Sequence, residues 1–400
     1  MTYARIARDL GASVVAVADP DAAARARCAQ EFGIADDRTF DDWQGLVAVP
    51  RLADAVAVCT QDRDHVGPTV AAAALGYHIL LEKPMATDRA GAQAIVDAVA
   101  EAGVVSAVCH VLRFTAYTRL VKRLLAEGAV GRVVAVQHLE PVGWWHFAHS
   151  FVRGNWRSEA ETSPMLLQKA VHDLDWVAHI VGEPVCRVSS FGALTEFRPE
   201  NRPAGAADRC LDCHMSDQCP YDAGRTYQGF LRSGDYRDWP LTVLTPRPDE
   251  ASIDQALRGG RYGRCVYAGD NDVVDHQVVS LEFPSGANAS LMVVAFTEMA
   301  NRKTRIFGSH GWLEGDGAHV RVHDFTSDTY TDHDADASDS HAGAGHGGGD
   351  EGLVRAFLKA VGQRDPSLVS SDVQASLASL EVAWAAEQAR RDGSVVTLPP

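Results

Sequence analysis

Two stretches near the N-terminus carry side chains suited to binding a nucleotide and a hydroxylated substrate. Glu82, Lys83 and Pro84 follow an apolar run typical of a β-strand, and open α/β sheets bind ligands at the carboxyl ends of their strands. A lysine there can donate a hydrogen bond to a substrate hydroxyl or a cofactor ribose; the alternative is an ordinary surface lysine. Asp19 also ends a predicted strand, where its carboxylate can accept hydrogen bonds from ribose hydroxyls and repel a 2′-phosphate. The equally probable alternative is that Asp19 caps the helix after Pro20. An acidic residue at this strand end favours NAD over NADP.

A cluster of cysteines indicates a metal site. Two residues separate Cys210 from Cys213, Cys219 follows nearby, and Cys265 could complete a tetrahedral set of four thiolates. This spacing predicts one structural Zn²⁺, which would stabilise a polar segment that has few apolar residues of its own. His214 is an alternative fourth ligand, and an iron–sulfur cluster has the same ligand demand. The remaining alternative is a set of reduced, unliganded thiols.

Residues 1–114 predict a doubly wound, Rossmann-type α/β domain. Short β-branched runs alternate with Ala-rich helical stretches, the pattern of a parallel sheet with crossover helices. The predicted strands are 13–18, 55–59, 78–84 and 104–110, and the predicted helices are 22–32, 65–75 and 88–102. Because Thr60 and His65 follow the second of these strands, we place them beside the cofactor together with Asp19, Glu82 and Lys83.

The first strand of such a domain is missing from the printed sequence. Residues 2–10 are typical of a helix that Gly11 ends, whereas the fold normally opens with a central strand and a glycine-rich turn that binds the pyrophosphate. We expect Met1 to be an internal methionine of a longer reading frame whose upstream codons supply that strand and turn.

Residues 115–400 predict an α+β domain with an open antiparallel sheet. One amphipathic helix over 164–180 precedes strands at 277–283, 287–296, 303–307 and 311–314. A polar insertion at about 195–270 carries the cysteines, and residues 332–350 form a loop rich in Gly, Asp and His. The open face of the sheet would suit a subunit interface, so we expect a dimer or tetramer.

Composition excludes several classes of protein. The net charge of −16 repels phosphate backbones and anionic membrane surfaces, so nucleic acid is not an expected partner. The sequence has no apolar run near the roughly 20 residues that span a bilayer and no signal-like start. A soluble protein of the cytoplasm is the expected class.

Four motifs together resemble the Gfo/Idh/MocA oxidoreductases. They are ADPD (18–21), LEKPMATD (81–88), RGNWR (153–157) and KAVHDLD (169–175). The resemblance implies a Rossmann domain that binds NAD(P) and a second domain whose sheet and first long helix form the substrate pocket. It also implies hydride transfer to or from a secondary alcohol of a sugar, glycoside or cyclitol.

The same resemblance gives roles to residues of the helix at 164–180. Lys83 matches the active-site lysine of the family and His172 the histidine of its catalytic helix, while Gln168 stands where the family usually has an aspartate. Lys169, His172 and Asp173 share one helical face, so Lys169 and His172 could serve one substrate hydroxyl. A base with a pKa near 7 suits removal of that proton, which favours His172. The alternative is a surface ion pair between Lys169 and Asp173 above a packed histidine.

Several further residues are suited to a polyhydroxylated ring, whose apolar faces stack on aromatic side chains. The predicted substrate-binding residues are Arg113, Arg153, Asn155, Trp156, Arg157, Gln168 and Asp173. Two rival functions remain open at this point. One is a catalytically silent binding or scaffold protein that lost cofactor binding; the other is a redox cycle that ends in net hydrolysis or elimination.

Overall fold

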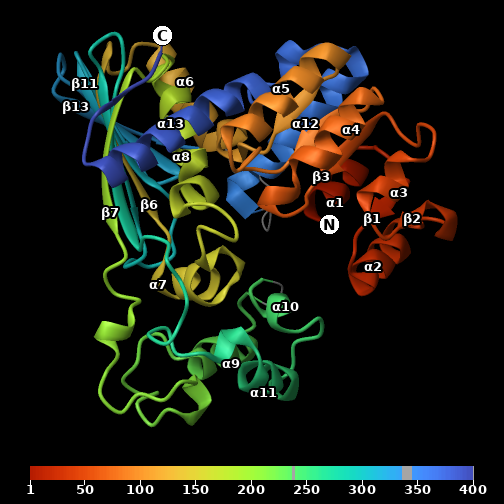
Figure 1. Ribbon diagram of the computed structural model, residues 1–400. Coiled ribbons are helices and arrows are strands. Elements are labelled where there is room, and N and C mark those ends of the chain that lie inside the picture. The colour runs from red at the N-terminus through yellow and green to blue at the C-terminus, as the bar shows by residue number, and fades with distance from the viewer. Residues whose placement is uncertain (237–238, 336–344, 400) are drawn as a thin grey trace.

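The computed structural model describes residues 1–236, 239–335 and 345–399. Figure 1 shows an N-terminal α/β unit beside a large sheet, with the helical insertion projecting from one end of that sheet. The predicted fold class is confirmed.

The parallel strands of the α/β unit form two separate sheets. In one, β1 pairs with β2; in the other, β4 lies between β3 and β5. Their bounds are β1 (Val17–Ala18), β2 (Thr39–Phe40), β3 (Ala55–Val58), β4 (His78–Leu81) and β5 (Ser106–Val108). Over the described ranges, no strand joins β1 to β3, at the place of the central strand that the sequence analysis finds missing. Because β3, β4 and β5 are parallel, the residues that follow them meet at one edge.

Helices cover these strands on both sides. Asp21 caps α2 by accepting the N–H groups of Ala23 and Ala24, and Asp88 caps α5 by accepting that of Gly91. Apolar side chains of α1 and α12 pack together against β4 and β5. The helices are α1 (Thr2–Asp9), α2 (Ala22–Phe32), α3 (Trp43–Val47), α4 (Val66–Ala74), α5 (Arg89–Ala102) and α12 (Gly349–Gln363).

The second unit is built on nine strands in the order β13-β12-β11-β10-β6-β9-β8-β7-β14. Every neighbouring pair is antiparallel except β6 and β9, which are parallel. The four predicted strands are confirmed as β8 to β11. The bounds are β6 (Val133–Pro141), β7 (Arg187–Ala193), β8 (His276–Glu282), β9 (Asn288–Val294), β10 (Lys303–Gly308), β11 (Gly311–Gly315), β12 (His319–Asp324), β13 (Thr329–Asp334) and β14 (Val396–Thr397).

One face of this sheet is covered by helices and the other is open. The long helices α8 (Met165–Val181) and α13 (Val373–Asp392) lie along the covered face, and α6 (Ala116–Ala126) lies near one end (Figure 1). In β6, Val136, His138 and Glu140 alternate with more exposed residues and are buried beneath the helices. The open face exposes apolar side chains, among them Phe191 and Met292.

The insertion between β7 and β8 has a small apolar core of its own. Its helices are α9 (Ala223–Ser233), α10 (Leu241–Leu244) and α11 (Glu250–Gly259). Tyr227, Leu241, Ile253 and Leu257 are almost completely buried in one cluster that also contains Cys210. The expectation that this segment lacks apolar material is therefore wrong, because its apolar residues are spread at helical spacing among polar ones.

Two further sequence expectations concern the glycine-rich loop and membrane-spanning segments. The predicted Gly, Asp and His-rich loop over 332–350 overlaps β13 at its start and α12 at its end, and its central residues 336–344 lie outside the described part of the chain. A search of the described helices finds none that is both long and apolar enough to cross a membrane.

Candidate active site

Lys83 connects the edge of the parallel strands to helix α8. It stands directly after β4 and Glu82, and its Nζ donates to the backbone carbonyl of Gln168 at 2.6 Å. Burial lowers the pKa of Lys83, an effect that Glu82 and Asp62 oppose and the positive charges of Lys169 and Arg302 reinforce. The predicted lysine thus lies next to the predicted catalytic helix, and its ammonium is destabilised relative to one in water.

Lys169 belongs to a buried network of charges between α8 and the sheet. Its Nζ lies 3.1 Å from Oε1 of Glu140 on β6, and Oε2 of Glu140 lies 2.8 Å from Nε of Arg302. Arg302 also donates from Nε to Oδ1 of Asp173 at 2.8 Å, and His138 Nε2 lies 3.0 Å from the same oxygen. The exposed i,i+4 pair between Lys169 and Asp173 considered from sequence is therefore wrong, because each has a partner on the sheet.

Asp173 is fully buried within this network. Burial by itself raises the pKa of a carboxyl group, but the Arg302 charge and the His138 hydrogen bond outweigh it and hold the pKa of Asp173 well below its usual range. His138 is fixed in turn by Thr304, whose Oγ1 lies 2.7 Å from Nδ1, and by stacking on Trp176. Asp173 therefore anchors α8 to the sheet.

His172 and Gln168 lie on the same helix and are both buried. The His172 ring packs edge-on against His110, with ring centroids 5.9 Å apart, and burial lowers the pKa of His110. The Gln168 amide nitrogen donates to Thr162 Oγ1 at 2.5 Å, whereas its Oε1 is buried without a hydrogen-bond partner among the described residues. That oxygen can accept a hydrogen bond from a ligand hydroxyl but cannot act as a base.

The predicted cofactor-binding residues lie at the strand ends. Asp19 follows β1, and its Oδ1 accepts the N–H of Asp21 at 2.8 Å. Because Asp21 is the residue that caps α2, the capping interpretation of Asp19 is wrong. Thr60 and Glu82 follow β3 and β4, and Glu82 accepts the Tyr3 hydroxyl at 2.8 Å. These carboxylate and hydroxyl groups are compatible with the ribose hydroxyls of a dinucleotide.

His65 and Arg113 are engaged in the fold itself. The ring nitrogens of His65 lie 2.8 Å from the carbonyl oxygen of Pro84 and 3.0 Å from that of Thr60, so this side chain joins two strand ends. Arg113 donates from Nε and Nη2 to the two oxygens of buried Asp175, both at 2.7 Å. His65 was predicted to contact the cofactor and Arg113 the substrate. In the structure, His65 holds two strand ends together and Arg113 holds α8 through Asp175.

Asp62 is a buried carboxylate that sequence reasoning missed. It begins a short 3₁₀ turn, η2 (Asp62–Asp64), just past β3. Burial raises the pKa of Asp62, while the charge of Lys83 and a hydrogen bond from the Trp156 side chain oppose that rise. Trp156, predicted to bind substrate, therefore faces the strand edge near Lys83.

The other residues of the RGNWR motif differ from one another in exposure and in their hydrogen-bond partners. Asn155 is exposed. Arg153 is buried and donates to the carbonyl oxygens of Arg264 and Tyr221, both at 2.8 Å. Arg157 pairs with Glu161 at 2.8 Å and with Asp270 at 3.1 Å. Both arginines line a cavity under the insertion together with residues of its last turn.

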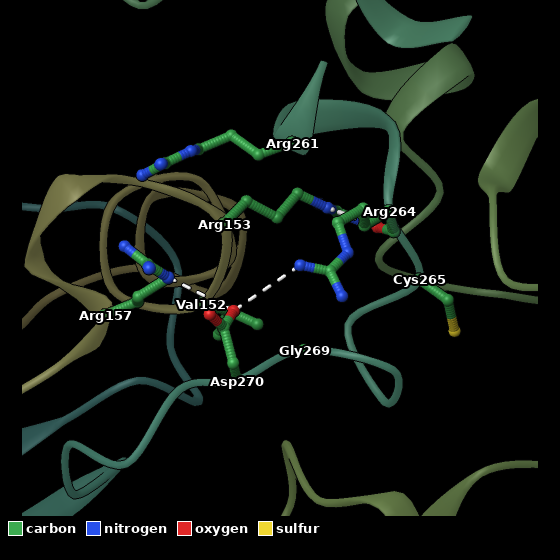
Figure 2. Close-up of a pocket in the computed structure, with 8 residues that line it drawn as sticks. All are labelled: Val152, Arg153, Arg157, Arg261, Arg264, Cys265, Gly269 and Asp270. Atoms are coloured by element: carbon green, nitrogen blue, oxygen red, sulfur yellow. Dashed lines mark hydrogen bonds and ion pairs between the residues drawn. The ribbon is translucent and has the colours of Figure 1, made fainter. Parts of the chain in front are cut away.

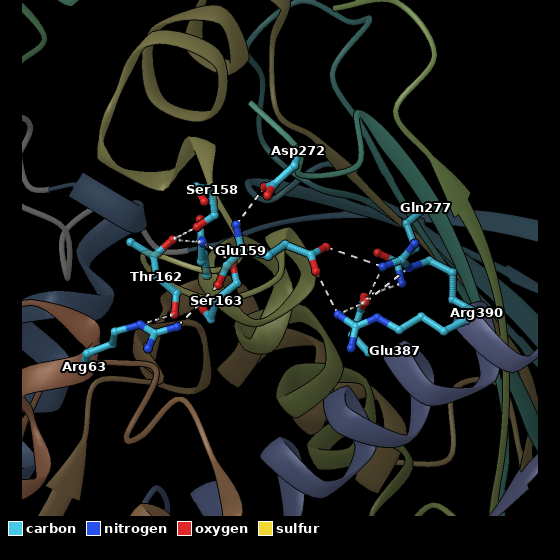
Figure 3. Close-up of polar contacts among 11 residues, drawn as sticks. Arg63, Ser158, Glu159, Thr162, Ser163, Asp272, Gln277, Glu387 and Arg390 are labelled. Atoms are coloured by element: carbon cyan, nitrogen blue, oxygen red, sulfur yellow. Dashed lines mark hydrogen bonds and ion pairs between the residues drawn. The ribbon is translucent and has the colours of Figure 1, made fainter. Parts of the chain in front are cut away.

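The segment 158–163, just before α8, is held from three sides (Figure 3). Arg63 of the α/β unit donates to the Thr162 carbonyl oxygen at 3.1 Å, and Asp272 accepts the Glu159 N–H at 2.7 Å. On α13, Arg390 lies 3.4 Å from the Glu159 carboxylate and 2.7 Å from Glu387. Because Thr162 holds the Gln168 side chain, this network positions the beginning of α8 opposite Lys83.

The predicted metal site is not supported. In the portions of the chain that the structure describes, no three His, Cys, Asp or Glu side chains are arranged to hold a metal ion. Cys210, Cys213, Cys219 and Cys265 are free thiols that line one cavity of about 190 Å³. The Cys210 sulfur lies 3.4 Å from Nη2 of Arg153, a cation that disfavours a second positive charge. The insertion has an apolar core of its own, around Tyr227 and Leu257.

Glu140, Arg302 and His138 were also missed. His138 and Glu140 lie on β6, and Arg302 directly precedes β10. The pairing of these two strands is not apparent in the sequence, so no local spacing relates the three residues to Lys169 or Asp173. A signal did exist in β6, where His138 and Glu140 stand at the period of two that defines one face of a strand. Polar residues on a buried strand face indicate a site or an ion network.

Comparison with known families assigns both units. The family described as "Oxidoreductase family, NAD-binding Rossmann fold" matches residues 3–110, and the one described as "Oxidoreductase family, C-terminal alpha/beta domain" matches residues 122–398. The two matches cover nearly the whole chain, so the chain belongs to the Gfo/Idh/MocA family of oxidoreductases.

Curated relatives match parts of the chain. It is 30% identical over 197 residues to the levoglucosan dehydrogenase of Pseudarthrobacter phenanthrenivorans, which is 49% of this chain and 48% of the relative. It is 25% identical over 280 residues to the putative oxidoreductase YteT of Bacillus subtilis, which is 66% of this chain and 61% of that protein. The 2,7-anhydro-N-acetylneuraminate hydratase of Escherichia coli is 31% identical over 133 residues, 33% of this chain and 35% of the relative. The matched segments thus span less than two thirds of each relative.

Solved structures share the fold over the full length. A levoglucosan dehydrogenase in complex with NADH and levoglucosan aligns with a TM-score of 0.67 at 17% identity, covering 100% of this chain and 95% of that chain. An oxidoreductase from Agrobacterium radiobacter in complex with NAD⁺, L-tartaric acid and magnesium aligns with a TM-score of 0.71 at 16% identity, covering 99% and 94%.

Proposed function

We propose that this protein transfers a hydride between NAD and a secondary alcohol carbon of a sugar, glycoside or cyclitol. The observation that carries the proposal is the contact between Lys83 Nζ and the Gln168 carbonyl, which brings the lysine of the strand edge to the catalytic helix that bears Lys169 and His172. Levoglucosan dehydrogenase, a relative that matches 49% of the chain, is named for an activity of this class.

In this proposal, some residues of the site bind the cofactor and substrate and others transfer the proton. NAD, when bound, supplies the hydride acceptor, and Asp19 with Thr60 and Glu82 would hold its ribose hydroxyls. Loss of a hydride from a carbinol carbon leaves an oxygen that must release its proton. In this proposal His172 takes that proton, Lys83 donates a hydrogen bond to the same oxygen, and Lys169 orients the substrate from its ion pair with Glu140. Arg113, Trp156, Gln168 and Asp173 shape the pocket.

A redox cycle that ends in hydrolysis or elimination is a second candidate. It is favoured by the relative named 2,7-anhydro-N-acetylneuraminate hydratase. Transient oxidation to a ketone would acidify the neighbouring carbon, and the hydride would return to the product. The two candidates differ in one readout, because only net oxidation accumulates NADH.

The test is a panel of levoglucosan, simple glucosides and inositols offered with NAD⁺ or NADP⁺, read by NADH or NADPH absorbance and by product analysis. We expect one ring alcohol to reduce NAD⁺ in preference to NADP⁺, and His172→Ala or Lys83→Met to lower kcat by about 10² or more. Lys359→Met, at an exposed lysine on α12, serves as the control and should be unaffected. Product formation without net NADH would select the second candidate; no turnover and no NAD binding would contradict both.

We further propose that the open face of the large sheet joins subunits into a dimer or tetramer in the cytoplasm. Its exposed Phe191 and Met292 side chains are apolar groups that association would remove from water.

A further inference from the structure

A cavity of about 190 Å³ lies where the last turn of the insertion meets the RGNWR motif (Figure 2). Residues from both segments line it: Val152, Arg153, Arg157, Arg261, Arg264, Cys265, Gly269 and Asp270. Its volume is about six times the share of one water molecule in the liquid, so it has room for a small ion with part of its hydration shell. None of the predicted catalytic residues lines this cavity.

The lining is strongly cationic in a protein that is otherwise acidic. Four arginines and one aspartate give the cavity wall a net charge of +3, whereas the whole chain carries −16. Guanidinium groups gathered around one space repel each other unless an anion lies between them. Asp270 does this in part, because it lies 3.1 Å from Arg157 and 3.5 Å from Arg264.

Two of the four guanidinium groups have no acidic partner among the described residues. Arg153 is only 5% exposed, and its hydrogen bonds go to the carbonyl oxygens of Arg264 and Tyr221 and to the Cys210 sulfur. Arg261 makes one hydrogen bond there, from Nη1 to the Gly154 carbonyl oxygen at 3.5 Å. Arg261 and Arg264 are exposed, whereas Arg153 is a buried guanidinium without a carboxylate partner. Burying such a charge is costly, so an anion in the cavity would stabilise it.

The neighbouring groups do not supply that anion. Cys210 donates from its sulfur to the Arg264 carbonyl oxygen at 3.8 Å, so it takes part as a thiol donor rather than as an anion. Asp222 lines the adjacent cavity rather than this one, and its Oδ1 caps α9 by accepting the Arg225 N–H at 2.7 Å. The other acidic partner of Arg157, Glu161, does not line the cavity either.

From this lining we infer a binding site for a tetrahedral dianion, a phosphate group, in the cavity formed by Arg153, Arg157, Arg261 and Arg264. One planar guanidinium group can donate to two phosphate oxygens at once. Several guanidinium groups around one space therefore favour a doubly charged phosphate over chloride. The group can be free inorganic phosphate or the phosphate of a phosphorylated metabolite. The site is separate from the proposed hydride-transfer chemistry, and its occupancy would tie the insertion to the segment that precedes α8.

The test is calorimetric titration of the full chain with inorganic phosphate at constant ionic strength, in the presence of saturating NAD so that the cofactor's own phosphate positions are filled. We expect saturable binding at one site and a higher melting temperature with phosphate than with chloride. Arg261→Gln combined with Arg264→Gln should weaken binding at least tenfold, because it removes two charged hydrogen-bond donors from the cavity wall. Parallel titration with glucose 6-phosphate distinguishes the sources: tighter binding of the ester identifies a phosphorylated metabolite, and equal affinity identifies free phosphate.

Two variants keep the result specific. Asp270→Asn removes the carboxylate that competes for Arg157 and Arg264, so it should tighten phosphate binding. Arg258→Gln, at an exposed arginine of α11 paired with Asp254, is the matched control and should leave affinity unchanged. Circular dichroism verifies that the variants fold. Absence of saturable phosphate binding to the unaltered protein, or equal affinity in the Arg261/Arg264 double variant, would overturn the inference.

Discussion

Replacing Asp173 by asparagine removes a buried negative charge while it keeps the shape of the side chain. Asp173 is fully buried, accepts from Arg302 at 2.8 and 3.3 Å, and lies 3.0 Å from His138. Loss of one partner of a buried ion pair costs about 3–5 kcal/mol. Because Glu140 still lies 2.8 Å from Arg302, we expect the lower end, about 3 kcal/mol of unfolding free energy. Because the entropy of unfolding is about 2.1 cal/mol/K per residue, a loss of about 3 kcal/mol in a chain of 400 residues should lower the melting temperature by about 3–4 °C.

The dependence of this effect on pH follows from the depressed pKa of Asp173. A carboxyl group whose folded pKa is lowered stabilises the fold fully above its unfolded pKa of about 4, and that stabilisation disappears as the pH falls through the folded value. The difference between the unaltered protein and Asp173→Asn should therefore be full near neutral pH and smaller at about pH 3. Urea unfolding followed by tryptophan fluorescence measures it. The control is Asp254→Asn, which breaks an exposed pair with Arg258 and should cost about 0–1 kcal/mol. A loss for Asp173→Asn no larger than that of the control would refute the reasoning.

Three further predictions concern the site and the assembly. Because burial lowers the pKa of Lys83, the alkaline limb of the kcat profile should lie below the usual lysine range near pH 10.4 and should be absent in Lys83→Met; stopped assays across pH test this. Gln168→Ala should lower kcat less than His172→Ala does, because an amide can only position the substrate; equal losses in steady-state kinetics would contradict that ranking. Phe191→Glu should shift the light-scattering mass toward the monomer, whereas an unchanged mass would exclude the open sheet face as the interface.

The elements that carry local signals were predictable from sequence. The helix predicted over 88–102 is confirmed as α5, which Asp88 caps, and the helix predicted over 164–180 is confirmed as α8. The position of Lys83 in the site was predicted from the strand that precedes it, because open α/β sheets bind ligands at the carboxyl ends of their strands. These predictions depend on residues close together in the chain.

What could not be predicted depends on pairing across long sequence separations. Arg302 meets Asp173 across 129 positions, and the bidentate contact of Arg113 with Asp175 spans 62. Arg113 was predicted to bind substrate, and its partner on α8 could not be foreseen because a partner on another helix leaves no mark near it in the sequence. The cysteines show the opposite case, in which a metal-like spacing lies in a segment that folds around an apolar core.

The most direct test of the central claim is the rate of NADH formation from a substrate deuterated at the reacting carbinol carbon. We expect a primary isotope effect on single-turnover NAD⁺ reduction by the unaltered protein. In His172→Ala the isotope effect should be retained, at a rate lower by about 10² or more. Transfer of deuterium to NAD and a normal rate in both Lys83→Met and His172→Ala would contradict the site assignment. Absence of deuterium from the NADH formed would contradict hydride transfer itself.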